Sequence, residues 1–133
     1  MILKLANKYR NIVVLSSGTT GTQVCDEFAK FFPNRYFTFG EAERNIASAS
    51  AGFALRGKMP VIVADNDFLT GAFEQIRDDI CESNLNVKII ITGGGLDEKK
   101  LADLLPNTKV YSGMGADDLE SIFFEYGPAI VFV

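Results

Sequence analysis

The sequence has 133 residues, a net charge of −4 and 47% hydrophobic residues, with 11 phenylalanines among them. This length fits one domain with a sizeable core. The acidic balance argues against nucleic acid as the main partner, because neutralising phosphates takes clustered Lys and Arg. No apolar run approaches the roughly 20 residues that span a bilayer. Histidine is absent, which excludes histidine-dependent triads and metal sites that need imidazole.

The two cysteines, Cys25 and Cys81, are far apart and fall in predicted helices. No CxxC motif accompanies them, so neither a disulfide framework nor a structural metal site is expected. The N-terminal stretch MILKLANKYRN has too short an apolar segment for a signal peptide. We therefore expect a cytoplasmic protein with both thiols reduced.

Along the chain, apolar β-branched runs alternate with helical patterns. The expected strands span residues 12–16, 35–39, 61–64, 87–92, 109–111 and 130–133, and the expected helices span 22–31, 41–55, 68–81, 96–105 and 117–126. This alternation predicts a single three-layer α/β domain over residues 1–133, with a mostly parallel twisted sheet and helices on both faces. The runs IVVLSS, VIVA and KIIIT are apolar without alternation, as strands covered on both faces should be.

In such sheets, ligands bind beyond the carboxyl ends of the strands. The loops expected at that edge are residues 17–21, 40–43, 65–68, 93–95 and 112–115. The hydroxyl-rich segment 16–22 could hold an anion at a helix N-terminus, although an ordinary turn uses the same residues and is the preferred interpretation. The three glycines at 93–95 are equally consistent with close approach to a ligand and with a flexible turn.

Two glutamates stand near the start of the helix expected at 41–55. Thr38-x-x-Glu41 matches a capping box, and Glu43 would lie in the first turn, where the helix dipole favours a carboxylate. On position alone both are structural. The helix that follows is nearly all small residues, so we expect it to be closely approached and buried, and a subunit interface is one place for it. A carboxylate at the buried end of such a helix is costly unless it is paired or used.

Several positions between residues 33 and 81 match one known pattern in a single register. They are Pro33, Arg35, Gly40, Glu43, Gly52, Ala54, Gly57, Pro60, Phe68, Gln75 and Ile76. The segment resembles the pyrimidine-binding domain of transketolases and deoxyxylulose-phosphate synthases, which are thiamine-diphosphate enzymes. The resemblance implies that the glutamate of Gly40-x-x-Glu43 is catalytic and hydrogen-bonds the N1′ atom of the cofactor's aminopyrimidine. It also implies that Phe68 stacks on this ring and that Gly40 belongs to the cofactor site.

The sequence also departs from that family. The family binds the diphosphate and its metal through a Gly-Asp-Gly…Asn motif on a different domain, and this sequence has no such motif. The substrate-binding histidines and a later arginine that grips sugar phosphate are missing as well, and Glu41 replaces a usually apolar residue. We therefore expect Mg²⁺ to be bound by a partner, with no metal ligand on this chain.

The resemblance implies a pyrimidine-binding subunit of a split thiamine-diphosphate enzyme that makes or breaks a C–C bond next to a carbonyl of a keto substrate. It would be inactive alone and active in an oligomer with a diphosphate-binding subunit. The alternative is a catalytically silent interaction or scaffold domain that retains the fold. The presence of both Glu43 and Phe68 favours the enzyme subunit.

Overall fold

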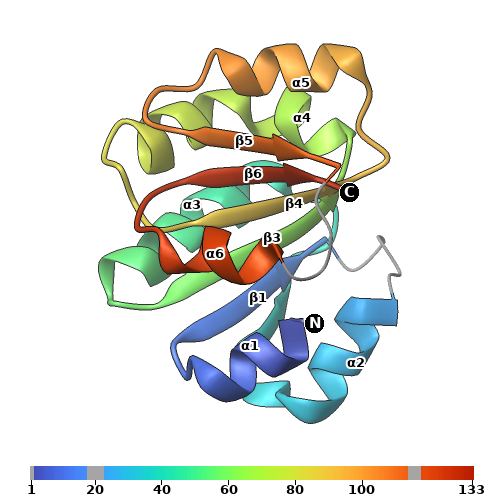
Figure 1. Cartoon of the computed structure of the whole chain (residues 1–133). Helices are drawn as coiled ribbons and strands as arrows, with labels where there is room; N and C mark the ends of the chain where they lie inside the picture. Colours follow the sequence, from blue (N-terminus) through green and yellow to red (C-terminus); the bar gives the residue numbers. More distant parts are fainter. Residues whose placement is uncertain (1, 18–22, 114–117) are drawn as a thin grey trace.

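A computed structural model describes residues 2–17, 23–113 and 118–133. In this part of the chain a single sheet has the order β2-β1-β3-β4-β6-β5, and every pairing is parallel. The strands are β1 (Ile12–Ser16), β2 (Tyr36–Thr38), β3 (Met59–Asp65), β4 (Lys88–Thr92), β5 (Lys109–Ser112) and β6 (Ala129–Phe132). Their carboxyl ends therefore meet at one edge of the sheet (Figure 1). The predicted α/β class is confirmed.

Helices cover both faces of the sheet. They are α1 (Ile2–Lys8), α2 (Gln23–Phe31), α3 (Glu43–Leu55), α4 (Asp67–Gln75), α5 (Leu96–Asp103) and α6 (Leu119–Phe124), with a 3₁₀ turn at Pro33–Arg35 and a π-helix, η2, at Ile76–Cys81. Figure 1 shows α3, α4 and α5 on one face and α1, α2 and α6 on the other. Each face has its own apolar core, because successive residues of the buried strands point to opposite sides.

Helix α1 was not expected from the sequence. Its buried residues Ile2, Leu5 and Ala6 follow helical spacing and pack against the core beside α2. The helix expected at 68–81 is present in two pieces: the backbone leaves helical geometry at Ala72 (φ −127°, ψ 19°), and the π-helix η2 follows α4 directly. The expected helix starts at Thr22 and Asp117 lie outside the described residues.

The capping box predicted at Thr38 and Glu41 is wrong. Thr38 is the last residue of β2 and pairs with Ser16, and Gly40 then turns the chain with a φ of +64°. Helix α3 begins only at Glu43, behind Ala42, which provides no side-chain cap. Glu43 does lie in the first turn of α3, as predicted.

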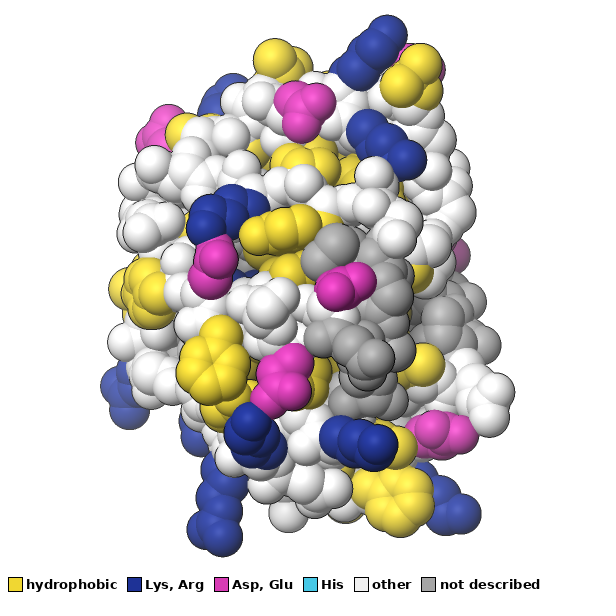
Figure 2. All heavy atoms as spheres, viewed as in Figure 1, with side chains coloured by type: hydrophobic (Ala, Val, Ile, Leu, Met, Phe, Trp, Pro, Cys, Tyr) yellow, Lys and Arg dark blue, Asp and Glu magenta, His cyan; other side chains and the backbone are white. Residues whose placement is uncertain are grey.

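Only one face of α3 is buried, so the expected burial is confirmed for half of the helix. Ile46, Ala47, Ser50 and Ala51 face the core, while Leu55 at the end of the helix is 72% exposed. Figure 2, which has the same viewpoint as Figure 1, shows charged side chains of both signs scattered among hydrophobic ones on the face turned toward the reader. Both cysteines are buried, and neither is part of a disulfide. No helix in the described ranges is long and apolar enough to cross a bilayer.

At the amino edge of the sheet, Arg35 holds three backbone carbonyls. Its Nε donates to the carbonyl of Ile12 at 2.8 Å, and its Nη2 donates to the carbonyls of Ala6 and Tyr9, each at 3.1 Å. The guanidinium also lies 4.5 Å from the ring centre of Phe32. Arg35 thus ties the end of α1 to the start of β1, which gives this family position a structural role.

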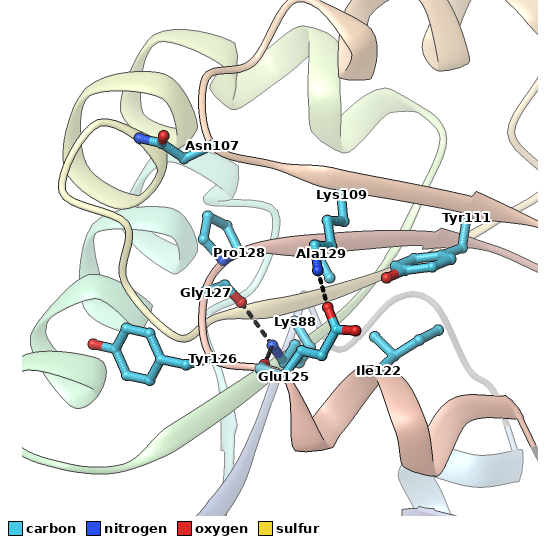
Figure 3. Close-up of a pocket in the computed structure, with 10 residues that line it drawn as sticks. All are labelled: Lys88, Asn107, Lys109, Tyr111, Ile122, Glu125, Tyr126, Gly127, Pro128 and Ala129. Atoms are coloured by element: carbon cyan, nitrogen blue, oxygen red, sulfur yellow. Dashed lines mark hydrogen bonds and ion pairs between the residues drawn. The ribbon is translucent and has the colours of Figure 1, made fainter.

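Lys88 plays a similar part at the same edge, although it is only 1% exposed. Its ammonium donates to the carbonyls of Glu125 and Gly127 at 2.7 and 2.6 Å, beside a cavity of about 20 Å³ that has room for one water (Figure 3). An ion pair between Lys109 and Glu125 lies next to it. Burial lowers the pKa of Lys88 from 10.5 to about 8.

Candidate functional site

The topology creates a crevice between β1 and β3. These strands are neighbours, but the connection from β1 runs through α2 on one face of the sheet and the connection from β3 runs through α4 on the other face. Loops that diverge in this way leave a gap at the carboxyl ends of the two strands, which is where parallel α/β sheets bind ligands.

A cavity of about 180 Å³ occupies this position. Its described lining residues are Ser17, Glu41, Glu43, Ala64, Asp65, Asp67 and Phe68. Three of the five loops expected at this edge therefore come together, the ones that follow β1, β2 and β3. The rest of the segment after β1, residues 18–22, lies outside the described residues. Both interpretations of this segment, an anion site and an ordinary turn, therefore stay predictions.

Four carboxylates and no basic side chain are found among the described lining residues. Glu43 and Asp67 are the first residues of α3 and α4, where the positive end of the helix dipole stabilises negative charge. Asp65 accepts a 3.2 Å hydrogen bond from the backbone N–H of Asp67. Within the described ranges none of the four forms an ion pair, and no group of acidic residues is arranged to hold a metal ion.

Glu43 lies where the sequence predicts a reactive carboxylate. Its side chain is half-buried, lines the cavity and rests against Gly71 of α4. Gly40 does not line the cavity. Its left-handed backbone conformation instead makes the turn from β2 toward Glu41 and Glu43, so its assignment to a cofactor site stays a prediction.

Phe68 forms part of the inner wall of the cavity, but its side chain is only 1% exposed. The ring belongs to the core under α3 and α4, together with Ile46 and Leu69. Little of its face is open for stacking in this structure, and the stacking role stays a prediction.

The glycine segment after β4 has a packing explanation. A Cβ on Gly94 would lie 2.5 Å from the ring of Phe132, so only glycine fits there. Sequence reasoning gave no role to Asp65 and Asp67, which the structure places at the cavity. The available signal was an Asp-Asn-Asp run directly after a buried strand, at the edge where ligands bind.

A parallel sheet with a small acidic cavity at its switch point has the architecture of α/β domains in which ligands bind at this edge. The family model for the pyrimidine-binding domain of transketolase matches residues 1–102, which is most of the chain. The chain therefore belongs to the transketolase pyrimidine-binding domain family.

Individual relatives agree with this assignment. A putative transketolase C-terminal section from Methanocaldococcus jannaschii is 38% identical over 96 residues, covering 71% of this chain and 30% of that protein. The 1-deoxy-D-xylulose-5-phosphate synthase of Halalkalibacterium halodurans is 32% identical over 144 residues, covering 96% of this chain and 23% of that protein. This chain thus spans less than a third of either curated relative.

Among solved structures, a split gene transketolase described as an inactive β4 tetramer superposes with a TM-score of 0.87 and 31% identity. The match covers 98% of this chain and 47% of that chain. Transketolase from Campylobacter jejuni shares the fold, with a TM-score of 0.75 at 13% identity over 96% of this chain and 23% of that one.

Proposed function

We propose that this chain is the pyrimidine-binding subunit of a split thiamine-diphosphate enzyme, which works with a separate diphosphate-binding subunit. The reaction would be the transfer or cleavage of a C–C bond next to a carbonyl. The observation that carries this proposal is Glu43 at the switch-point cavity of a transketolase pyrimidine-domain fold.

The cavity suits the aminopyrimidine part of the cofactor. Its volume of about 180 Å³ exceeds the roughly 150 Å³ that accommodates a benzene ring, but it is smaller than a typical site for a whole drug-sized ligand. Its carboxylates are acceptors, and they complement an amino group and a positively charged ring system. When bound, the cofactor would supply a thiazolium ring that stabilises negative charge on the carbonyl carbon of the substrate.

The same carboxylates make the cavity unsuitable for the diphosphate. Two phosphate groups beside Glu41, Glu43, Asp65 and Asp67 would meet like charge, with no lysine or arginine in the described lining to compensate. This supports a second subunit that provides the diphosphate and Mg²⁺ site, with the active site formed between the two chains.

In this arrangement Glu43 acts as the acid–base group. With the cofactor bound, a carboxyl at the N1′ atom would exchange a proton with the pyrimidine, and the 4′-amino group in its imino form would then accept the proton from C2 of the thiazolium. Position in the first turn of α3 keeps the carboxylate at the mouth of the crevice. No histidine is needed for this step.

The alternative is a silent scaffold domain. The 1% exposure of Phe68 favours it, because an aromatic ring that stacks on a ligand needs an open face. The four carboxylates without ion pairs in the described part of the chain favour the enzyme subunit, because a scaffold gains nothing from concentrating like charges at one cavity.

Reconstitution tests the proposal. The chain should co-purify with the product of a neighbouring reading frame that carries Gly-Asp-Gly…Asn, and calorimetry should show Mg²⁺-dependent binding of thiamine diphosphate only to the mixture. Tight binding to the isolated chain would refute the two-subunit arrangement, since most of the affinity should come from the diphosphate and its metal. A mixture that assembles and binds no cofactor would support the scaffold.

We also propose that the isolated chain self-associates. The exposed side of α3 carries Ser48, Gly52 and Leu55, a surface that another chain can approach closely. The β4 tetramer of the related split gene transketolase supports this. Light scattering at high concentration should report an oligomer, and a monodisperse monomer would contradict it.

A further inference from the structure

Helix α4 is broken at the point where it passes Glu43. Gly71 is exposed on α4, and the next residue, Ala72, leaves helical geometry. A kink of this kind redirects the backbone and frees carbonyl groups from the helical ladder. The Nε of Arg44 lies 3.4 Å from the Gly71 carbonyl, so two consecutive residues of α3 approach the break.

The contact between Glu43 and Gly71 is made by the side chain of one and the backbone of the other. A Cβ added to Gly71 would lie 3.6 to 3.7 Å from the Cβ, Cγ and Cδ atoms of Glu43. The glutamate therefore lies flat along α4, with its stem over the one residue that has no side chain. No hydrogen bond or ion pair to a described residue fixes its carboxylate, so packing against this glycine sets its position.

We propose that Gly71 is a positioning residue for Glu43: its missing side chain sets how far the carboxylate lies back from the cavity. The inference rests on the proposed role of Glu43 and adds a residue that touches neither cofactor nor substrate. A Cβ alone would make ordinary van der Waals contact and leave Glu43 in place. A branched side chain cannot easily turn away, so it would push the glutamate stem toward the cavity.

Gly71→Ala and Gly71→Val test this in the reconstituted complex, with Thr70→Val as the matched control. Thr70 is the exposed neighbour on the same helix and does not line the cavity. Alanine at 71 should leave kcat within about threefold. Valine should lower kcat about 10- to 100-fold, the scale of a misplacement near 1 Å, with KM for the keto substrate nearly unchanged. Thr70→Val should change neither.

The melting temperatures of the variants distinguish a positioning role of Gly71 from a general loss of stability. Alanine and valine both have higher helix propensity than glycine and Gly71 is exposed, so the melting temperature of each variant should stay close to that of the wild type. In the isolated chain, a nuclear Overhauser effect should connect the Gly71 Hα atoms with the Glu43 Hγ atoms. Its absence would overturn the inference, whether or not the valine variant folds.

The outcomes also distinguish the inference from the proposed function. If Glu43→Gln leaves exchange of the cofactor's C2 proton unchanged, the proposed function fails. If Glu43→Gln stops exchange while Gly71→Val keeps wild-type kcat, only the positioning role of Gly71 is refuted.

Discussion

The two edges of the sheet differ in whether their charged side chains have partners within the described part of the chain. At the amino edge, Arg35 and Lys88 donate to five backbone carbonyls of this chain. At the carboxyl edge, four carboxylates line one cavity and none has an ion pair within the described ranges. Lys88 is buried and Arg35 is half-buried, and both charges are compensated by carbonyls of the same chain, so the amino edge contributes to the stability of the fold. The carboxyl edge lacks such partners, which agrees with the binding role proposed for it.

Glu43→Gln should have the largest effect, and it concerns the carboxyl edge. Glutamine keeps the size of the side chain and can still hydrogen-bond N1′, but it cannot exchange a proton there. Exchange of the C2 proton in the reconstituted complex should slow by about 10²- to 10⁴-fold, while assembly is unchanged. The measurement is hydrogen–deuterium exchange of bound cofactor, read by NMR after acid quench. If the C2 proton of the variant exchanges as fast as that of the wild type, Glu43 is not the acid–base group, and the two edges do not differ in function as proposed.

Arg35→Met should have the largest effect at the amino edge. Methionine keeps an apolar stem over Phe32 but leaves the carbonyls of Ala6, Tyr9 and Ile12 without this donor. The free energy of unfolding should fall by about 3 to 5 kcal/mol, because hydrogen bonds from a charged donor are worth about 1.5 to 3 kcal/mol each and these three overlap. Urea denaturation measures it. A loss below about 1 kcal/mol would show that the amino edge does not depend on this residue.

Lys88 makes the stability of the amino edge depend on pH. Below pH 8 the amine is protonated in both the folded and the unfolded chain. Between pH 8 and 10.5 the folded chain has lost the proton and the unfolded chain keeps it, so unfolding takes up a proton. The free energy of unfolding should therefore rise with pH over this range, by up to about 3 kcal/mol. The neutral amine still has two N–H groups for its two carbonyls.

Lys88→Met is the control for this pH dependence. Urea denaturation at several pH values from 7 to 10.5 should show a rise in the wild type that is absent from the variant. If the free energy of unfolding changes with pH in the same way in the wild type and the variant, the lowered pKa of Lys88 does not affect stability.

Glu41→Gln should have the smallest effect and sharpens the comparison within the carboxyl edge. Glu41 is exposed and precedes α3, so it does not cap the helix. Its loss should change stability by about 1 kcal/mol or less, and C2 exchange should stay within about threefold of wild type. If this variant is the inactive one, the catalytic carboxylate has been assigned two residues too late.

Much of the fold follows from the sequence because its signals are local. The apolar run at residues 12–16 predicts β1 with its observed ends, and continuous apolar runs identify β3 and β4 as buried on both faces. The loops at the carboxyl edge follow from the alternation of strands and helices, so the sequence also predicts the neighbourhood of Glu43. Helix α1 escapes prediction because seven residues give too short a periodic pattern.

The features that escape prediction depend on contacts between distant segments. Thr38 matches a capping box by spacing, but pairing with β1 holds it in a strand and moves the helix start to Glu43. The break at Ala72 lies beside a carbonyl that Arg44 of α3 approaches, and Lys88 donates to carbonyls 37 and 39 residues later in the chain. Local propensity is a weak guide wherever tertiary contacts decide the backbone.

The contact between Gly94 and Phe132 has a consequence for engineering. In a library that varies the loop after β4 to obtain new substrate specificity, every variant with a side chain at Gly94 would clash with Phe132 at the end of β6. The end of β3 and the residue after it, Asp65 and Asn66, are better positions for laboratory evolution, because Asp65 is exposed and lines the cavity and Asn66 is half-buried beside it in sequence.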